Sequence, residues 1–244
     1  MTIPVLCDLT GDQNGVISGA VMAKPITSIT IVGGGTAGWL AATFLRSKCS
    51  KKIDITLIES PNVPTVGVGE ATVPNMSATL RELGINDQQF FQRCNASIKM
   101  GVMFRQWNVD HRGDFFDYMN PFITPPSLDK MEMGYFYHAY GAGKRDFIQS
   151  FSPLMELLEA GKCPLSFGGK EDPMPRVGYA YHLDAVKFAG LLAEVGTERG
   201  VTHILDDVED VELDNRGHVA ALQLKEHGRH EVEFVIDCSG FQGL

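Results

Sequence analysis

Three glycines and one glutamate stand at spacings that suggest a specific chemistry. Gly33, Gly35 and Gly38 form a G-x-G-x-x-G pattern directly after residues 29–32, which are apolar or β-branched. The first glycine permits a tight turn, the second lets backbone approach a pyrophosphate, and the third lets helix and strand pack closely. Glu59 follows Gly33 by 26 positions (59 − 33), near the spacing of about 20 expected for an acid that binds a ribose hydroxyl. The pattern predicts a dinucleotide site, with a glycine-rich turn without ligand as the alternative.

Two strands and a helix must position these residues. Residues 29–32 and 53–58 have the composition of buried parallel strands. A helix predicted from Thr36 follows the glycine turn, and its N-terminus presents unpaired N–H groups to phosphates. Because a strand, a helix and a second strand in this order form a right-handed crossover, the two strands should be parallel neighbours. The predicted fold class is therefore α/β, with a Rossmann-like fold.

The composition argues against several classes of protein. The chain has 244 residues, of which 44% are hydrophobic, so it can bury a sizeable core. Its net charge of −9 argues against a nucleic-acid or anionic membrane surface, and no apolar run is long enough to span a bilayer. The five cysteines are scattered and lack a C-x-x-C pair, which predicts neither a zinc site nor a disulfide framework. A reducing cytoplasm is the predicted compartment.

The rest of the chain divides into a short leader and one main domain. Residues 1–25 are predicted to be a leader or disordered tail, with an ordered strand at residues 3–6 as the alternative, and residues 26–244 form the domain. The proline- and glycine-rich stretch after Glu59 predicts a loop. One helix is predicted at residues 75–83, and a second begins after the N-cap Asn86. A third runs from Asp184 to Gly200, with an apolar stripe of Val186, Ala189, Leu192 and Val195. Further strands are predicted at residues 201–205, 208–213, 218–225 and 232–236.

Residues 108–180 are predicted to be an irregular insert. They hold seven of the twelve prolines, and all six tyrosines of the chain fall within residues 118–181. Aromatic walls suit a flat apolar ligand, so one interpretation is a module that faces the substrate. A second small hydrophobic core is the other interpretation, and the two are compatible.

Lys99 is the candidate catalytic side chain. It lies in a predicted strand, residues 98–107, where the apolar Ile98, Met100 and Val102 alternate with it. A period of two sends Lys99 to the opposite face of the strand, which we expect to border a cavity near the aromatic insert. On spacing alone, a solvated strand lysine is the better interpretation.

Several stretches together resemble the flavin-dependent tryptophan halogenase family. The resemblance runs from about Ile26 to Leu244 and is carried by GGGTAGW at residues 33–39 and GVGEATVP at residues 67–74. LIES at residues 57–60, YHLD at 181–184, DDV at 206–208 and DCSG at 237–240 add to it. It implies an FAD-binding fold of the glutathione-reductase type, with FAD contacts from Gly33, Gly34, Gly35, Thr36, Ala37, Gly38, Glu59, Ser60, Ala71 and Val208.

The resemblance also implies a reaction. FADH2 from a separate flavin reductase would react with oxygen and with chloride or bromide to give hypohalous acid. Lys99 matches the lysine that halogenation requires in this family, and the substrate would be an electron-rich, indole-like aromatic ring. The resemblance leaves a homodimer open.

Two departures from the family pattern limit these expectations. The run at residues 115–118 has no histidine, which does not favour free tryptophan as the substrate. The family's W-x-W-x-I-P motif is absent, since Trp39 and Trp107 are the chain's two tryptophans. The sequence therefore looks like an N-terminal fragment of a halogenase, with an FAD-dependent monooxygenase or a catalytically incomplete FAD-binding fragment as alternatives.

Overall fold

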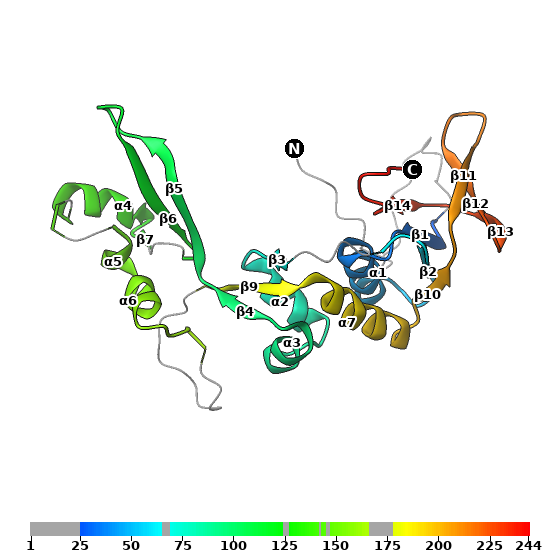
Figure 1. The fold of residues 1–244 in the computed structure, drawn as a ribbon, viewed down its shortest axis with the longest axis horizontal. Coiled ribbons are helices and arrows are strands. Elements are labelled where there is room, and N and C mark those ends of the chain that lie inside the picture. The colour runs from blue at the N-terminus through cyan, green and yellow to red at the C-terminus, as the bar shows by residue number, and fades with distance from the viewer. Residues whose placement is uncertain (1–24, 65–68, 124–126, 142, 145–146, 166–177) are drawn as a thin grey trace, which may run out of the picture.

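A four-stranded parallel sheet forms the centre of one end of the molecule (Figure 1). The computed structural model describes residues 25–64, 69–123, 127–141, 143–144, 147–165 and 178–244. In sheet order the strands are β10 (Thr202–Leu205), β2 (Asp54–Glu59), β1 (Ser28–Val32) and β14 (Val235–Asp237). Strands β1 and β2 pair in parallel with Ile31 opposite Leu57, which confirms the predicted neighbours.

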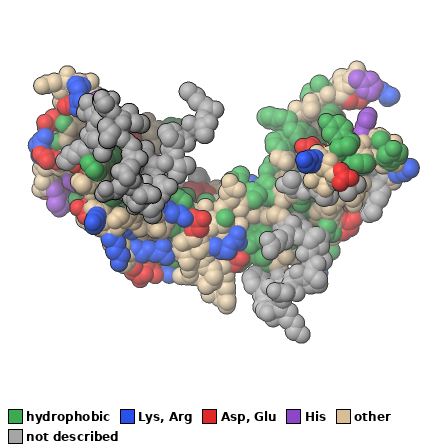
Figure 2. Space-filling view, turned by 180° about the vertical axis from the view of Figure 1, so that it is seen from behind, with side chains coloured by type: hydrophobic (Ala, Val, Ile, Leu, Met, Phe, Trp, Pro, Cys, Tyr) green, Lys and Arg blue, Asp and Glu red, His purple; other side chains and the backbone are tan. Residues whose placement is uncertain are grey.

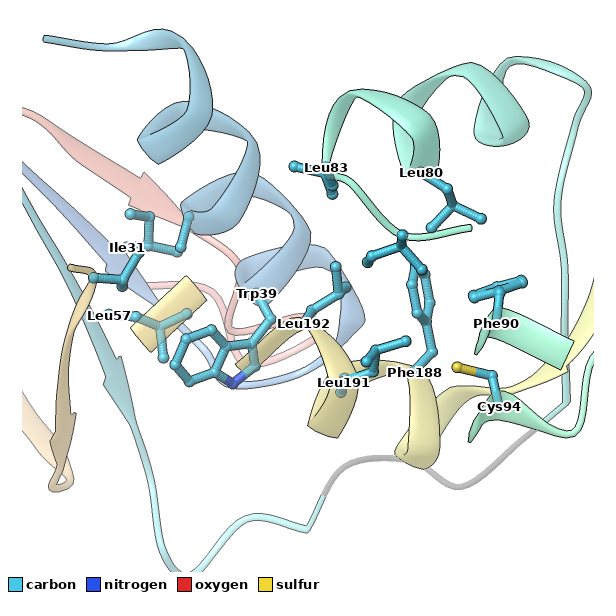
Figure 3. Packing of buried hydrophobic residues seen from close by; sticks show 14 of the residues in the cluster. Ile31, Trp39, Leu57, Leu80, Leu83, Phe90, Cys94, Phe188, Leu191 and Leu192 are labelled. Carbon is cyan, nitrogen blue, oxygen red and sulfur yellow. The ribbon is translucent and has the colours of Figure 1, made fainter. Parts of the chain in front are cut away.

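Two helices cover one face of this sheet. Helix α1 (Thr36–Lys48) starts at the predicted residue and packs against α7 (Ala185–Glu198). Trp39 from α1 and Leu192 from α7 join Leu57 of the sheet in the main hydrophobic cluster (Figure 3). A fully buried aromatic or leucine side chain contributes about 1.5–3 kcal/mol through removal of its apolar surface from water. This cluster therefore fixes α1, and with it the glycine turn, against the sheet.

An antiparallel sheet covers the opposite face. It consists of β11 (Val208–Leu213), β12 (Val219–Leu224) and β13 (Gly228–Glu231), and its Leu222 packs with Val32 and Ile58 of the parallel sheet. The single strand predicted at residues 232–236 is wrong. Residues 228–231 pair with β12 and residues 235–237 join β1, so the chain must change sheets between them.

A small three-stranded sheet links the two ends of the molecule (Figure 1). Strand β9 (Ala180–Asp184) lies between β3 (Gly69–Ala71) and β4 (Ser97–Lys99). Strand β3 was not predicted, because three residues inside a proline- and glycine-rich stretch carry too short a pattern. Helices α2 (Asn75–Glu82) and α3 (Asp87–Cys94) confirm the predicted pair, and the Asn86 side chain caps α3 by accepting from Gln89 N at 2.8 Å.

The predicted strand at residues 98–107 is divided at Met100. Strand β4 pairs with β9, whereas β5 (Gly101–Val109) pairs with β6 (Phe115–Pro121). Met100 lies at this change of partner and is buried beside Leu154, with Ile98 packed against the same small cluster. An alternating pattern predicts extended backbone, but the partner of each half is set by distant residues.

The prediction of an irregular segment at residues 108–180 is wrong for its described part. Pro121 is the last residue of β6 and Pro153 is the N-cap of the helix at Leu154–Glu159, so these prolines stand at the ends of elements. The elements that follow the hairpin are β7 (Ser127–Leu128), β8 (Met131–Glu132), α4 (Met133–Phe136), the π-helical turn η1 (Tyr137–Gly141), α5 (Phe147–Phe151) and α6 (Leu154–Glu159).

Helix α7 begins after the N-cap Asp184, but its buried face differs from the predicted stripe. Val186 is 49% exposed, whereas Phe188 and Leu191 are buried. Phe188 stands two residues after Val186, about 200° further round the helix, and it packs edge-on against Phe90 of α3 at 5.2 Å. Helix α7 thus buries a face wide enough to contact both the sheet and α3.

Two sequence expectations concern features beyond this core. Residues 1–24, where the leader and its alternative strand were predicted, lie outside the described residues. Over the part of the chain that is described, no helix has the length and apolar character needed to cross a membrane.

Candidate dinucleotide site

A pocket of about 460 Å³ lies where β1 and β2 end and α1 begins. Parallel strands end at one edge of their sheet, and ligands of open α/β folds bind at that edge. Of the predicted cofactor residues, those lining the pocket are residues 33–37, Glu59, Ser60 and Val208. The structure thus brings together segments that are up to 175 positions apart (208 − 33).

The three motif glycines occupy three different environments. Gly33 has a φ of +115°, and a Cβ built on it would lie 2.3 Å from the Cys238 carbonyl oxygen. A Cβ on Gly38 would lie 1.8 Å from the Gly33 carbonyl oxygen, so this glycine allows α1 to pack onto the turn and is not itself a lining residue. A Cβ on Gly35 would meet no described atom within 4 Å. Gly35 therefore leaves open space at the N-terminus of α1, where an anion is favoured.

Position 34 must be glycine because of the Glu59 side chain, not because of the turn geometry. A Cβ on Gly34 would lie 2.0 Å from the Glu59 Cδ atom, so any larger residue would displace this side chain. The Glu59 carboxylate lies over the glycine turn, and its Oε2 atom faces two donors. Trp39 Nε1 donates at 3.3 Å, and His203 Nε2 lies at 2.9 Å. Sequence reasoning named neither donor for this role, because they come from α1 and β10.

Asp206 and Asp207 hold the far wall of the pocket. Asp206 is 2% exposed and accepts from the backbone N–H groups of Asp207, Glu226 and His227 and from His227 Nδ1 at 2.7 Å. Burial raises the pKa of this carboxyl group, but the hydrogen bonds from His227, Glu226 and Asp207 outweigh burial and hold the pKa at about 2. Asp206 is therefore an anion that fastens the β12–β13 turn to the pocket.

The loop after β2 is tied to the same wall. The Ser60 hydroxyl donates to Asp207 Oδ1, and Asn62 Nδ2 donates to Asp207 Oδ2 at 2.6 Å. Both carboxylate oxygens of Asp207 are thereby used within the protein. Two adjacent aspartates directly after a strand were the available sequence signal for this wall.

The end of the described chain completes the pocket. Cys238, Ser239, Gly240, Gln242 and Leu244 are lining residues that sequence reasoning did not assign to a site. They lie here because β14 pairs in parallel with β1, so both strands end at the same edge of the sheet. The DCSG run was visible in the sequence, but its spatial neighbour was not.

Lys99 and Ala71 lie outside this pocket. Among its described lining residues neither appears, whereas Glu70 of β3 does. The half-buried Lys99 Nζ donates to the Thr72 carbonyl oxygen at 3.1 Å and lies 5.4 Å from the centroid of the Phe122 ring. The carbonyl group that holds the lysine thus belongs to Thr72, two positions after the pocket residue Glu70. Phe122 was not predicted as a neighbour of Lys99, because it follows the β5–β6 hairpin in the sequence and lies near Lys99 only in the folded chain.

The fold and this pocket define an α/β protein of the Rossmann-like, FAD-binding fold class with a dinucleotide-type pocket. Residues 28–244 match the tryptophan halogenase family, and the chain belongs to that family. The family membership and the α/β fold expected from the sequence are confirmed.

Named relatives agree with this assignment. Tryptophan 6-halogenase ThaL of Streptomyces albogriseolus is 32% identical over 240 residues, covering 91% of this chain and 44% of the relative. The structure of a tryptophan halogenase from Shewanella frigidimarina is 36% identical with a TM-score of 0.79, covering 91% of this chain and 44% of that one. BrvH, a flavin-dependent halogenase from Brevundimonas, is 31% identical with a TM-score of 0.73, covering 90% and 43%. The chain thus spans less than half the length of these relatives.

Proposed function

We propose that the chain binds FAD at this pocket and serves as the flavin-binding portion of a halogenase. The observation that carries the proposal is the open space at Gly35, at the N-terminus of α1, with the Glu59 carboxylate beside it. The N–H groups of this helix end would hold the diphosphate, and Glu59 would accept from the adenosine ribose. Ser60, Ala71 and Val208 are the proposed further contacts.

The residues present fit this cofactor. The pocket is about 460 Å³, and its glycines leave the backbone accessible where a diphosphate would lie. FADH2, oxygen and chloride or bromide would together supply hypohalous acid. The protein would bind the cofactor and shield the oxidant from water until it reaches Lys99.

Lys99 would deliver the halogen to the substrate. Its amine is anchored by the Thr72 carbonyl oxygen and lies beside the Phe122 ring, which limits its motion. An amine can hydrogen-bond hypohalous acid or form a haloamine, and either places an electrophilic halogen at a fixed point. Such positioning is a source of both rate and regioselectivity. The substrate would be an electron-rich, indole-like aromatic compound, and a separate flavin reductase in the cytoplasm would supply FADH2.

We propose FAD binding by the 244-residue chain independently of any halogenation by it. Because the chain spans about 44% of its relatives, binding and halogenation are separate expectations. A folded unit that binds FAD without halogenating is therefore the second candidate. An FAD-dependent monooxygenase is a third, and it would have no need of Lys99.

Flavin titration tests the placement of the cofactor. We expect the purified chain to bind FAD, and Gly35→Val to raise its Kd at least tenfold, because the added side chain fills the space for the diphosphate. Gly190→Ala, on α7 away from the pocket, is the matched control and should bind as the parent does. Equal FAD affinity of Gly35→Val and the parent would show that the diphosphate lies elsewhere.

A lysine variant tests the chemistry in a chain that includes the rest of the enzyme. Flavin reoxidation and halogenated product are followed together, the product by mass spectrometry with a panel of indoles, pyrroles and phenols. Lys99→Ala should abolish product and leave reoxidation unchanged, while Lys187→Ala, an exposed lysine on α7, should leave both unchanged. Full product yield from Lys99→Ala would refute the catalytic role of Lys99. Efficient halogenation by the 244-residue chain would refute the interpretation that this chain is catalytically incomplete.

A further inference from the structure

The Glu59 carboxylate is held by two elements on one face of the parallel sheet. In the β10–β2 pairing, His203 lies opposite Leu57, and Glu59 follows two residues later on the same face. Diagonal neighbours of this kind are within reach of long side chains. Helix α1 covers that face and places Trp39 over it, with its ring edge-on to His203 at 4.8 Å. Strand register and helix packing therefore bring the three side chains together.

The hydrogen bonds at this carboxylate are distributed unequally between its oxygens. A carboxylate can only accept, so His203 must carry its proton on Nε2 and donate to Oε2 at 2.9 Å. Trp39 Nε1 donates to the same oxygen at 3.3 Å. Two donors occupy the two lone pairs of Oε2, and among the described residues none donates to Oε1, which leaves its lone pairs for a ligand. The carboxylate is thus fixed in orientation before any ribose is bound.

We infer that His203 is a positioning residue for the nucleotide ribose, acting through Glu59. This inference rests on the proposed placement of FAD. His203 and Trp39 hold Oε2 so that Oε1 receives the ribose hydroxyl, and His203 makes the shorter of the two hydrogen bonds. Because the carboxylate already has a fixed orientation, less conformational entropy is lost when the ribose binds. Loss of His203 should therefore weaken the binding of ligands that carry this ribose hydroxyl.

Two substitutions separate the hydrogen bond from the packing. His203→Phe keeps a ring against Trp39 but removes the donor, and His203→Gln keeps a donor near the position of Nε2. The loss of one hydrogen bond to a charged acceptor predicts a Kd for FAD that is raised about tenfold in His203→Phe. His203→Gln should stay within about twofold of the parent, because the bond is retained. Trp39→Phe should give a smaller increase than His203→Phe, because its hydrogen bond is longer.

FAD analogues show whether the effect passes through the ribose. The parent and His203→Phe are titrated with FAD, 2′-deoxy-FAD and 3′-deoxy-FAD in isothermal calorimetry. For the analogue that lacks the bound hydroxyl, the tenfold difference between the two proteins should fall to about twofold or less. A purely structural role predicts the same loss of affinity for all three ligands, and that result would overturn the inference.

Glu59→Gln distinguishes failure of the inference from failure of the FAD placement. If Glu59→Gln weakens FAD binding and His203→Phe does not, His203 has no positioning role while the placement stands. If the parent binds no FAD, or Glu59→Gln binds as the parent does, the placement and the inference both fail. Melting curves check that each variant is folded. His203→Leu takes the place of His203→Phe if the phenylalanine variant melts at a clearly lower temperature, and it is held to the same tenfold expectation.

Discussion

The two ends of the molecule differ in how their aromatic side chains are used. In the end that holds the candidate dinucleotide site, called the nucleotide end below, Trp39, Phe90 and Phe188 are at most 1% exposed and pack edge-on against neighbours. In the end formed by the β5–β6 hairpin and α4–α6, Trp107 is 70% and Tyr140 74% exposed. Figure 2 shows hydrophobic side chains gathered over the surface of this second end.

The difference separates a region with a large buried core from one with a small buried cluster. The hairpin end has a small buried cluster built on Met100 and Leu154, so the interpretation as a second small core holds for those residues. A pocket of about 560 Å³ lies between the hairpin and α5, lined partly by Met103, Met119 and Phe147. An exposed aromatic surface of this kind suits contact with further polypeptide or with a flat substrate. The nucleotide site, by contrast, is built on a large core.

The largest expected effect compares one buried and one exposed phenylalanine. Phe188→Ala should lower the free energy of unfolding by about 3–5 kcal/mol, because it opens a cavity between α7, α3 and the sheet. Phe115→Ala, at a position 68% exposed on the hairpin, should change it by no more than about 0.5 kcal/mol. Urea unfolding measures both. Similar losses for the two variants would mean that the hairpin end is as tightly packed as the nucleotide end.

A pair of glycines sharpens the comparison within the nucleotide end. Gly38→Ala places a Cβ 1.8 Å from the Gly33 carbonyl oxygen and should cost about 1–3 kcal/mol by forcing α1 away from the turn. Gly190→Ala meets open space on α7 and should stabilise the chain by about 0.5–1 kcal/mol. Thermal unfolding of both variants shows whether each substitution raises or lowers stability. A stabilised Gly38→Ala would show that the turn and helix are not in close contact.

The smallest expected effect is a pH dependence at Asp206. Its folded pKa of about 2 lies below the ordinary value of 3.8, so the folded state favours the charged form. The stabilisation is present above about pH 4 and is lost as the pH falls towards 2. Asp206→Asn should therefore melt below the parent at pH 7, with a gap that narrows as the pH falls to 2. A gap that stays constant between pH 7 and pH 2 would contradict the role of the charge.

The sequence by itself determined the nucleotide motif and its immediate frame. Residues 29–59 predicted a strand, a glycine turn, a helix and a second strand, and the structure has all four in order. Periodicity and glycine spacing suffice here because each element is specified by residues within one or two turns of it. The cap Asn86 was readable for the same reason, since its side chain bonds a backbone group three residues away.

Only the tertiary structure decided which distant groups meet at the site. Two donors to Glu59 come from α1 and β10, the far wall comes from Asp206, and the last described residues reach the pocket because β14 lies beside β1. The division at Met100 and the change of sheet before β14 have the same origin. An alternating pattern specifies that a segment is extended, but strand partners are chosen by packing between residues remote in sequence, and no local pattern records that choice.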